Sequence, residues 1–271
     1  MHLPHNAVYR AVTSLDVWGA VPPIRNLATA DIVCVLGYTH ALTGATTWLV
    51  VAPPLAEAMS RSLTPVELGA GTLACAGAAL VPDLDHPQAT VSRTFGPVSQ
   101  SVARFTQLVS GGHRHATHSF LFAGMAGVAA WLMAVAGEWW AWGLMFVLAA
   151  FAIRALGLLP RRWSGNGKSI FVMLEAALVT GLLHYGGVAD WWWLGPAMTV
   201  GCLAHIGPLA IPPAADFCTP ERVPLFWPIK KRLGFPLIAH TGNWAETKII
   251  APATTLLLLA LIYWRFISPV I

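Results

Sequence analysis

The chain has 271 residues, of which 56% are hydrophobic and 10% are charged. Soluble domains usually carry about 25% charged residues, so this composition argues against a soluble domain and predicts an integral membrane protein. The formal net charge of +4 bears on membrane topology rather than on binding to nucleic acid. The cysteines form no C-x-x-C pair, which indicates neither a disulfide framework nor a zinc knuckle.

Seven apolar stretches follow an N-terminal arm that is expected over residues 1–30. Most are close to the ~20 residues that a helix needs to cross a bilayer, although the second is short. Tryptophan runs open the fourth and the sixth, as is typical of segments that begin at a membrane interface. The sequence therefore predicts an all-α integral membrane protein with about seven transmembrane helices in one bundle, formed by a single domain over residues 31–271. The expected spans are 32–52, 66–81, 120–136, 139–159, 169–188, 191–211 and 249–267.

The connections after the second, fourth and sixth spans carry most of the Lys and Arg residues, and the other connections carry almost none. By the positive-inside rule these connections lie in the cytoplasm, which predicts a multi-pass protein of the cell membrane with a cytoplasmic N-terminus. Arg61 and Arg265 oppose this orientation weakly. Residues 83–118 and 212–248, two of these connections, read as long polar loops.

Carboxylates and histidines gather in the first of these loops, around VPDLDHP at residues 81–87 and GGHRHATHS at 111–119. Oxygen and imidazole donors at this density are typical of a divalent metal site. In the predicted topology, further donors approach the same cytoplasmic face from the first and sixth spans and from the loop after the sixth. Glu246, which precedes the last span on that face, reads as a ligand, a general base or an interfacial charge. The candidate ligands are His40, Asp83, Asp85, His86, His113, His118, His205 and Asp216.

Each of these groups also has a simpler interpretation. Asp83 and Asp85 would share a face of an extended segment, and paired carboxylates can bridge two metals for phosphoester cleavage, but an exposed Asp pair can also simply end a helix. His113 and His118 read as ligands or as part of a hydrated interfacial loop. Arg114 either binds a phosphate with its guanidinium or anchors the loop at the cytoplasmic face.

The order of these motifs resembles the YdjM-like family of predicted membrane-bound metal-dependent hydrolases, also labelled LexA-binding inner-membrane-associated hydrolases. The similar segments are 39–44 (THALTG), 81–87, 112–119, 216–219 (DFCT), 223–228 (VPLFWP) and 241–246 (TGNWAE). In the family an Asp follows the late histidine, here His205, within about one helical turn. Leu209 occupies that place, and Asp216 comes after a proline-containing insertion. Either the insertion loops out and Asp216 reaches the site, or one ligand is lost.

The resemblance implies a metal-dependent hydrolase. The candidate ligands and their place at the membrane face predict a membrane-embedded site that uses a metal-activated water on a phosphoester of a lipid or amphiphile. The histidines favour zinc, and the carboxylates leave manganese or iron open, with one or two ions. Two alternatives stay open: a divalent-metal transporter, which predicts ligands at several depths, and a metal-binding membrane scaffold without catalysis. The residues expected to act in catalysis are Asp85, Arg114, His118 and Glu246.

Overall fold

The structure is a computed structural model, and it describes residues 34–158, 166–188, 190–207, 216–218, 222–235 and 244–268. The expected N-terminal arm lies outside these residues, as do Arg161 and Arg162 in the basic loop between the fourth and fifth predicted spans. In the described part of the chain the regular structure is helical, apart from one isolated antiparallel bridge between Val223 and Leu233. The predicted all-α class is therefore confirmed.

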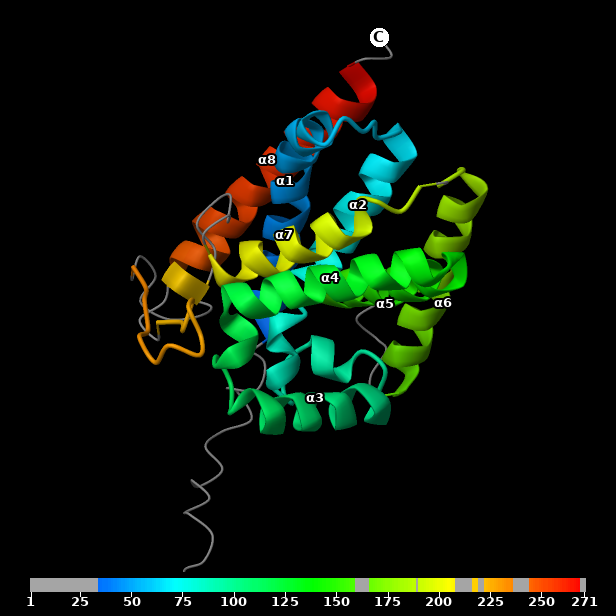
Figure 1. Cartoon of the computed structure of the whole chain (residues 1–271). Helices are drawn as coiled ribbons and strands as arrows, with labels where there is room; N and C mark the ends of the chain where they lie inside the picture. Colours follow the sequence, from blue (N-terminus) through cyan, green and yellow to red (C-terminus); the bar gives the residue numbers. More distant parts are fainter. Residues whose placement is uncertain are drawn as a thin grey trace, which may run out of the picture.

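The principal helices appear in Figure 1, and short helical turns connect them. Their bounds are α1 (Cys34–Ala58), α2 (Pro65–Ala78), α3 (Pro97–Ser110), α4 (Phe120–Ala136), α5 (Glu138–Leu156), α6 (Asn166–Tyr185), α7 (Leu194–Ile206) and α8 (Ala251–Ile262). Local sequence sets several ends. A capping box starts α2, because the Thr64 hydroxyl accepts from the Glu67 backbone N–H while the Glu67 carboxylate accepts from the Thr64 N–H. Ser119 caps α4 by accepting from the Phe122 N–H.

Within the described ranges, four helical segments are long and apolar enough to cross a membrane: Pro65–Asp85, Glu138–Leu156, Gly167–Tyr185 and Glu246–Ile267. The apolar helices Phe120–Ala136 and Leu194–Ile206 are shorter than a full span. A crossing helix needs about 20 residues at 1.5 Å per residue, so these two lengths alone do not establish spans. The chain is thus a helical protein with apolar, membrane-length segments, and the predicted count of seven goes beyond what helix length establishes.

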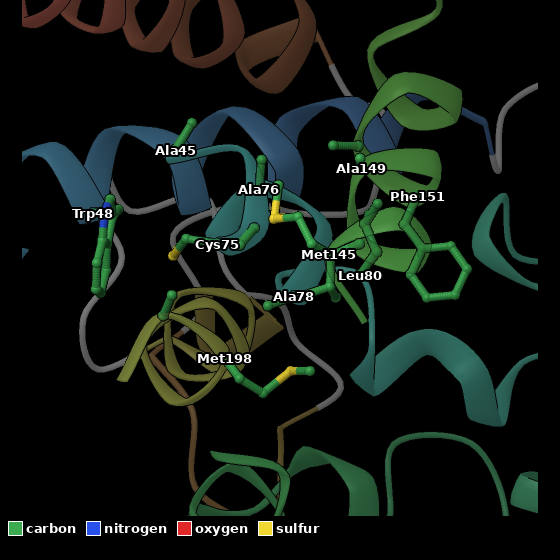
Figure 2. Close-up of a cluster of buried hydrophobic side chains, with 14 of the residues drawn as sticks. Ala45, Trp48, Cys75, Ala76, Ala78, Leu80, Met145, Ala149, Phe151 and Met198 are labelled. Atoms are coloured by element: carbon green, nitrogen blue, oxygen red, sulfur yellow. The ribbon is translucent and has the colours of Figure 1, made fainter. Parts of the chain in front are cut away.

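Helix α2 lies at the centre of the fold and packs against α1, α5 and α7. Small residues allow this close approach: a Cβ on Gly44 of α1 or on Gly201 of α7 would lie 2.6 Å from the Cys75 carbonyl oxygen of α2. Figure 2 shows Cys75 among the buried side chains of this cluster. Packing through small residues is how helices associate where water supplies no driving force. This packing also fixes the ends of α2, which Asp83 follows after a few residues, and of α7, which carries His205.

The expectation of a polar loop over residues 83–118 is wrong in part, because α3 occupies its middle. Gly96, with a φ of 60°, and Pro97 start this helix, and Gly111 ends it in the left-handed conformation. Figure 1 shows α3 lying crosswise below the lower ends of α2 and α6. Its apolar residues are interspersed with Ser, Gln and Thr, so the segment reads as polar although the apolar residues share one side of a helix.

Candidate metal centre

Four segments that are distant in sequence bring two carboxylates and two imidazoles to one point. Asp83 belongs to the turn η2 (Pro82–Asp85) that follows α2, and His118 belongs to η4 (Ala116–His118), just before α4. His205 lies in the last turn of α7, and Asp216 begins η5 (Asp216–Cys218). One ligand atom from each of these four residues lies within 4.8 Å of the others. Such a group can hold a metal ion.

The two histidines are turned so that their Nε2 atoms face the carboxylates. The Nε2 atoms of His118 and His205 are 3.2 Å apart, and Asp216 Oδ2 lies 3.0 Å from the first and 3.4 Å from the second. Asp83 Oδ1 lies 3.9 Å from His118 Nε2 and 3.6 Å from His205 Nε2. Two nitrogens bound at ~2.0–2.1 Å to a tetrahedral zinc lie roughly 3.3 Å apart. The donor set and its spacing therefore fit a divalent ion.

Protein groups hold the other nitrogen of each of these histidines. His205 Nδ1 donates to the Ala79 carbonyl oxygen at 2.7 Å, just after α2 ends. His118 Nδ1 lies 3.0 Å from the Thr117 hydroxyl and 3.5 Å from Asp85 Oδ2. An outer hydrogen bond of this kind fixes the tautomer and orientation of a metal-binding histidine. These contacts leave the Nε2 atoms of His118 and His205 facing each other and the carboxylates of Asp83 and Asp216.

Asp85 is fully buried and surrounded by donors. Its Oδ2 accepts from the Arg114 backbone N–H at 3.0 Å and from the Thr117 hydroxyl, and its Oδ1 lies 2.7 Å from His113 Nδ1. Asp83, Asp85 and His113 together form a second group that could hold an ion, sharing Asp83 with the first. Asp85 is thus placed either to bind an ion or to hold His113, Thr117 and the loop backbone in position.

Arg114 pairs with Asp216 inside the site, with its Nη2 atom 2.8 Å from Asp216 Oδ1. Burial alone would raise the pKa of Asp216, but the Arg114 guanidinium and hydrogen bonds from His118 and His205 hold it well below its usual range. Burial alone would likewise lower the pKa of His118, yet hydrogen bonds to Asp216 and Asp85 raise it from 6.5 to about 9. Without a metal ion, then, Asp216 is ionised and His118 is protonated at neutral pH.

His40 and His86 occupy the edges of the cluster. The ring of His40 stacks on that of His205 at 3.9 Å, and its Nε2 lies 4.0 Å from Asp216 Oδ1. Its buried Nδ1 atom has no hydrogen-bond partner among the described residues. His86 is half-buried, packs edge-on against His113, and accepts from the Gln88 N–H with its Nδ1. Burial and the neighbouring His113 lower the pKa of His86.

Two further residues of the sequence motifs are Glu246 and His115. Glu246 is buried at the start of η6 (Glu246–Ile250), the turn that leads into α8, and α8 packs against α1. His115 turns away from the cluster, with its Nδ1 3.0 Å from the Ser110 carbonyl oxygen.

The sequence left open whether Asp216 reaches the site, and the structure decides this. The structure also adds two groups that the sequence did not predict, the Thr117 hydroxyl and the Ala79 carbonyl. Asp216 reaches the cluster despite the insertion after His205. Thr117 links Asp85 to His118, and the Ala79 carbonyl orients His205. The place of Thr117, directly before a candidate histidine, was a usable signal for such a role. A backbone carbonyl gives no signal in sequence.

An all-helical fold with membrane-length apolar helices and a buried Asp/His cluster defines a class: membrane proteins with a candidate metal centre. The particular family follows from sequence comparison. The chain belongs to the YdjM inner membrane protein family, whose sequence profile matches residues 35–270. The resemblance noted in the motifs is thereby confirmed. Comparisons with curated proteins and with solved structures give no match.

Proposed function

We propose that this protein is a membrane-embedded, metal-dependent hydrolase that cleaves a phosphoester of a lipid or amphiphilic substrate. One observation carries the proposal: the Nε2 atoms of His118 and His205 face each other at 3.2 Å beside the carboxylates of Asp83 and Asp216. Two imidazoles and two carboxylates suit zinc first and manganese or iron next. His40 and the Asp83–Asp85–His113 group are the candidates to complete the site or to hold a second ion.

A divalent ion held there would act as a Lewis acid and supply an activated water for hydrolysis. The chain's own residues would do the rest. Asp85 and Thr117 keep His118 in the ligating orientation. Arg114 holds Asp216 in place by its ion pair. To bind a substrate phosphate as well, its guanidinium would have to bond to the phosphate and to the Asp216 carboxylate at the same time. Glu246 is the remaining candidate for a general base.

Exposure indicates the side from which a substrate would enter. The side chains of His118, His205 and Asp216 are at most 3% exposed, whereas that of Asp83 is 18% exposed and that of His113 is 31% exposed. A phosphoester would therefore approach past Asp83 and His113. This is the edge where the two candidate metal-binding groups meet, since both contain Asp83. This edge lies beyond the end of α2, so a headgroup would reach it more readily than an acyl chain.

The membrane arrangement proposed with this activity is a single domain of about seven spans in the inner membrane, with the N-terminus and the site on the cytoplasmic side. The family membership and the apolar helices support the membrane location. The placement of Arg93, Arg104 and Arg114 in the segment that bears the site supports the cytoplasmic side. No nucleic-acid partner is proposed.

The transporter alternative predicts ligands along a path through the bilayer. Among the described residues, Glu175 and His184 are the candidates for such a path, and both lie on α6, which packs against α5. Neither belongs to the Asp/His cluster. One compact cluster supports a resident ion better than a conducting path, and it leaves the non-catalytic scaffold as the alternative that activity measurements must test.

The first experiment is elemental analysis of detergent-purified protein. We expect one or two equivalents of zinc, manganese or iron in the unsubstituted chain, and loss of metal from His118→Ala and Asp85→Ala. His184→Ala, an exposed histidine outside the cluster, is the matched control and should retain metal. If the unsubstituted protein contains no metal and the variants fold normally, the proposal of a metal site is overturned.

Activity is tested next on the metal-loaded protein. Phospholipids in mixed micelles and a soluble aryl phosphate are supplied in parallel, and release of phosphate or headgroup is measured. Cleavage of the lipid that His118→Ala abolishes supports the proposal. A metal-loaded protein that cleaves neither substrate class would favour the scaffold alternative.

A further inference from the structure

Helix α3 carries its apolar residues on the side that faces away from the protein. Val98, Val102, Phe105 and Val109 recur at the spacing of one helix face, and between 46% and 69% of each is exposed. Leu108 borders this stripe and is 80% exposed. A helix on the surface of a soluble domain turns its apolar stripe inward, so α3 has the opposite arrangement.

The protein-facing side of α3 is small and polar instead. Ser99, Ala103 and Ser110 are buried, and α3 packs with them against the turns η2 and η3 (Val91–Arg93). The Ser99 hydroxyl donates to the Ser92 carbonyl oxygen and accepts from the Phe95 N–H. These bonds attach α3 to η3 and the residues after it, and α3 also packs against η2, which carries Asp83 and Asp85. The apolar stripe is left without a partner in the described chain.

A third side of the helix is polar and basic. Gln100, Arg104 and Gln107 lie at the same helical spacing, and Arg104 is exposed. At about 100° per residue, the buried stripe is centred roughly 110° from the apolar stripe and roughly 90° from the polar stripe around the helix axis. One faces the protein, one is apolar and one is polar. A helix with this division fits a boundary between lipid and water, because each medium then meets the matching stripe.

We propose that α3 is an interfacial helix whose stripe of Val98, Val102, Phe105 and Val109 inserts into the bilayer leaflet on the side of the Asp/His cluster. Continuity with the membrane-embedded part supports a bilayer rather than another protein. After the site loop the chain enters α4, whose exposed Leu121, Met125, Val128 and Leu132 line an apolar groove. In Figure 1 the end of α3 and the start of α4 lie on the same side of the molecule.

The distribution of charge on and near α3 also favours a lipid bilayer. The exposed Arg93 precedes α3 and the exposed Arg104 lies on its polar stripe, where a basic side chain meets anionic headgroups while the apolar stripe enters the acyl region. At 14 residues the helix is too short to cross a bilayer, so it would lie along the surface. The cluster, joined to α3 through η2, would then be held at headgroup depth.

The test places a fluorescent label on single added cysteines in the full chain, reconstituted in vesicles of zwitterionic and anionic phospholipid. Val102→Cys and Phe105→Cys report on the apolar stripe, and Gln100→Cys and Gln107→Cys are the matched controls on the polar stripe of the same helix. Quenching is measured with nitroxide lipids labelled high on the acyl chain and with aqueous iodide. The unsubstituted chain gives the background from its native cysteines, of which Cys75, Cys202 and Cys218 are buried.

We expect lipid quenching to be at least about twofold stronger at the apolar-stripe positions than at the controls, with iodide quenching in the reverse order. Equal iodide quenching at all four positions would overturn the proposal. Protection of the apolar stripe from both quenchers would also overturn it and would indicate a second copy of the chain or another protein on this face. The measurement involves neither metal nor substrate, so its outcome is independent of the proposed hydrolysis.

Discussion

Thr117 offers a sharp test of the proposed centre because its hydroxyl contacts two site residues and lies outside the proposed donor set. It bonds to Asp85 Oδ2 and lies 3.0 Å from His118 Nδ1. Replacing Thr117 with Val removes the hydroxyl and keeps the shape of the side chain. If the hydroxyl orients His118 for an ion, the substitution weakens metal binding although every ligand remains.

The size of the effect follows from the contacts that are lost. Removing an outer partner of a metal-binding histidine typically costs about 10- to 100-fold in metal affinity, or roughly 1.4–2.8 kcal/mol. A hydrogen bond to a charged group contributes about 1.5–3 kcal/mol to stability, so the metal-free variant should also unfold at a lower temperature. Thr43→Val is the matched control, because among the described residues the buried Thr43 hydroxyl bonds to the Thr39 carbonyl oxygen, one turn earlier in α1, and to no site residue.

The assay is competition of the purified, metal-stripped protein with a chelating dye for zinc and manganese, beside thermal unfolding with and without metal. Thr117→Val should shift the dissociation constant and Thr43→Val should leave it unchanged. If Thr117→Val binds metal as tightly as the unsubstituted chain, the Thr117 hydroxyl does not orient His118 for an ion. The reasoning also fails if both variants lose affinity equally, because the effect would then be one of general packing.

Three further perturbations probe the same region. Because the pKa of His118 is raised to about 9, ion binding must release its proton, and metal affinity should rise about tenfold per pH unit between pH 7 and 9, as measured by dye competition; a flat profile would contradict this. The same shift stabilises the metal-free protein below pH 6.5, and this contribution is lost as pH rises through about 9. Gly201→Ala puts a Cβ 2.6 Å from α2 backbone and should lower both the unfolding temperature and metal affinity, whereas Gly143→Ala, with open space around it, should do neither. Arg114→Gln removes one charged partner of the buried Asp216 carboxylate and leaves the protonated His118 as another. It should therefore cost less than the about 3–5 kcal/mol of a buried charge left without any partner, measured by calorimetry of the metal-free protein, and metal should restore much of the loss. Equal losses with and without metal would argue against an ion beside Asp216.

The fold was most predictable where apolar runs are long and their ends are marked. The span expected at residues 120–136 is α4, Phe120–Ala136, since Ser119 caps its start and Gly137 breaks its end. The span expected at 191–211 ends earlier, as α7, at Ile206. Helix α3 escaped prediction because its apolar residues are diluted by Ser, Gln and Thr, and overall polarity hides a one-sided stripe.

The clustering of the site was predicted from the expected topology, in which alternate connections lie on one membrane face. On that expectation Asp83, His118 and His205 share one side, and the structure places their ligand atoms together. The expected topology could not decide whether Asp216 reaches them, because the path of an insertion depends on packing that local sequence does not encode. The position of Thr117 before His118 hinted at a supporting role, but its bond to Asp85 could not be predicted, because that bond joins residues brought together only by the folded chain.

The hydrogen bond from His205 to the Ala79 carbonyl has a consequence for biogenesis. It joins residues separated by 126 positions, and Asp216 follows later still. During synthesis the first half of the chain can contribute Asp83 and His118, but it cannot present the complete donor set until α7 has docked on α2. If the cluster holds an ion, as proposed, tight ion capture would be a late event that reports completed assembly, and an unfinished chain would compete poorly for scarce cellular metal.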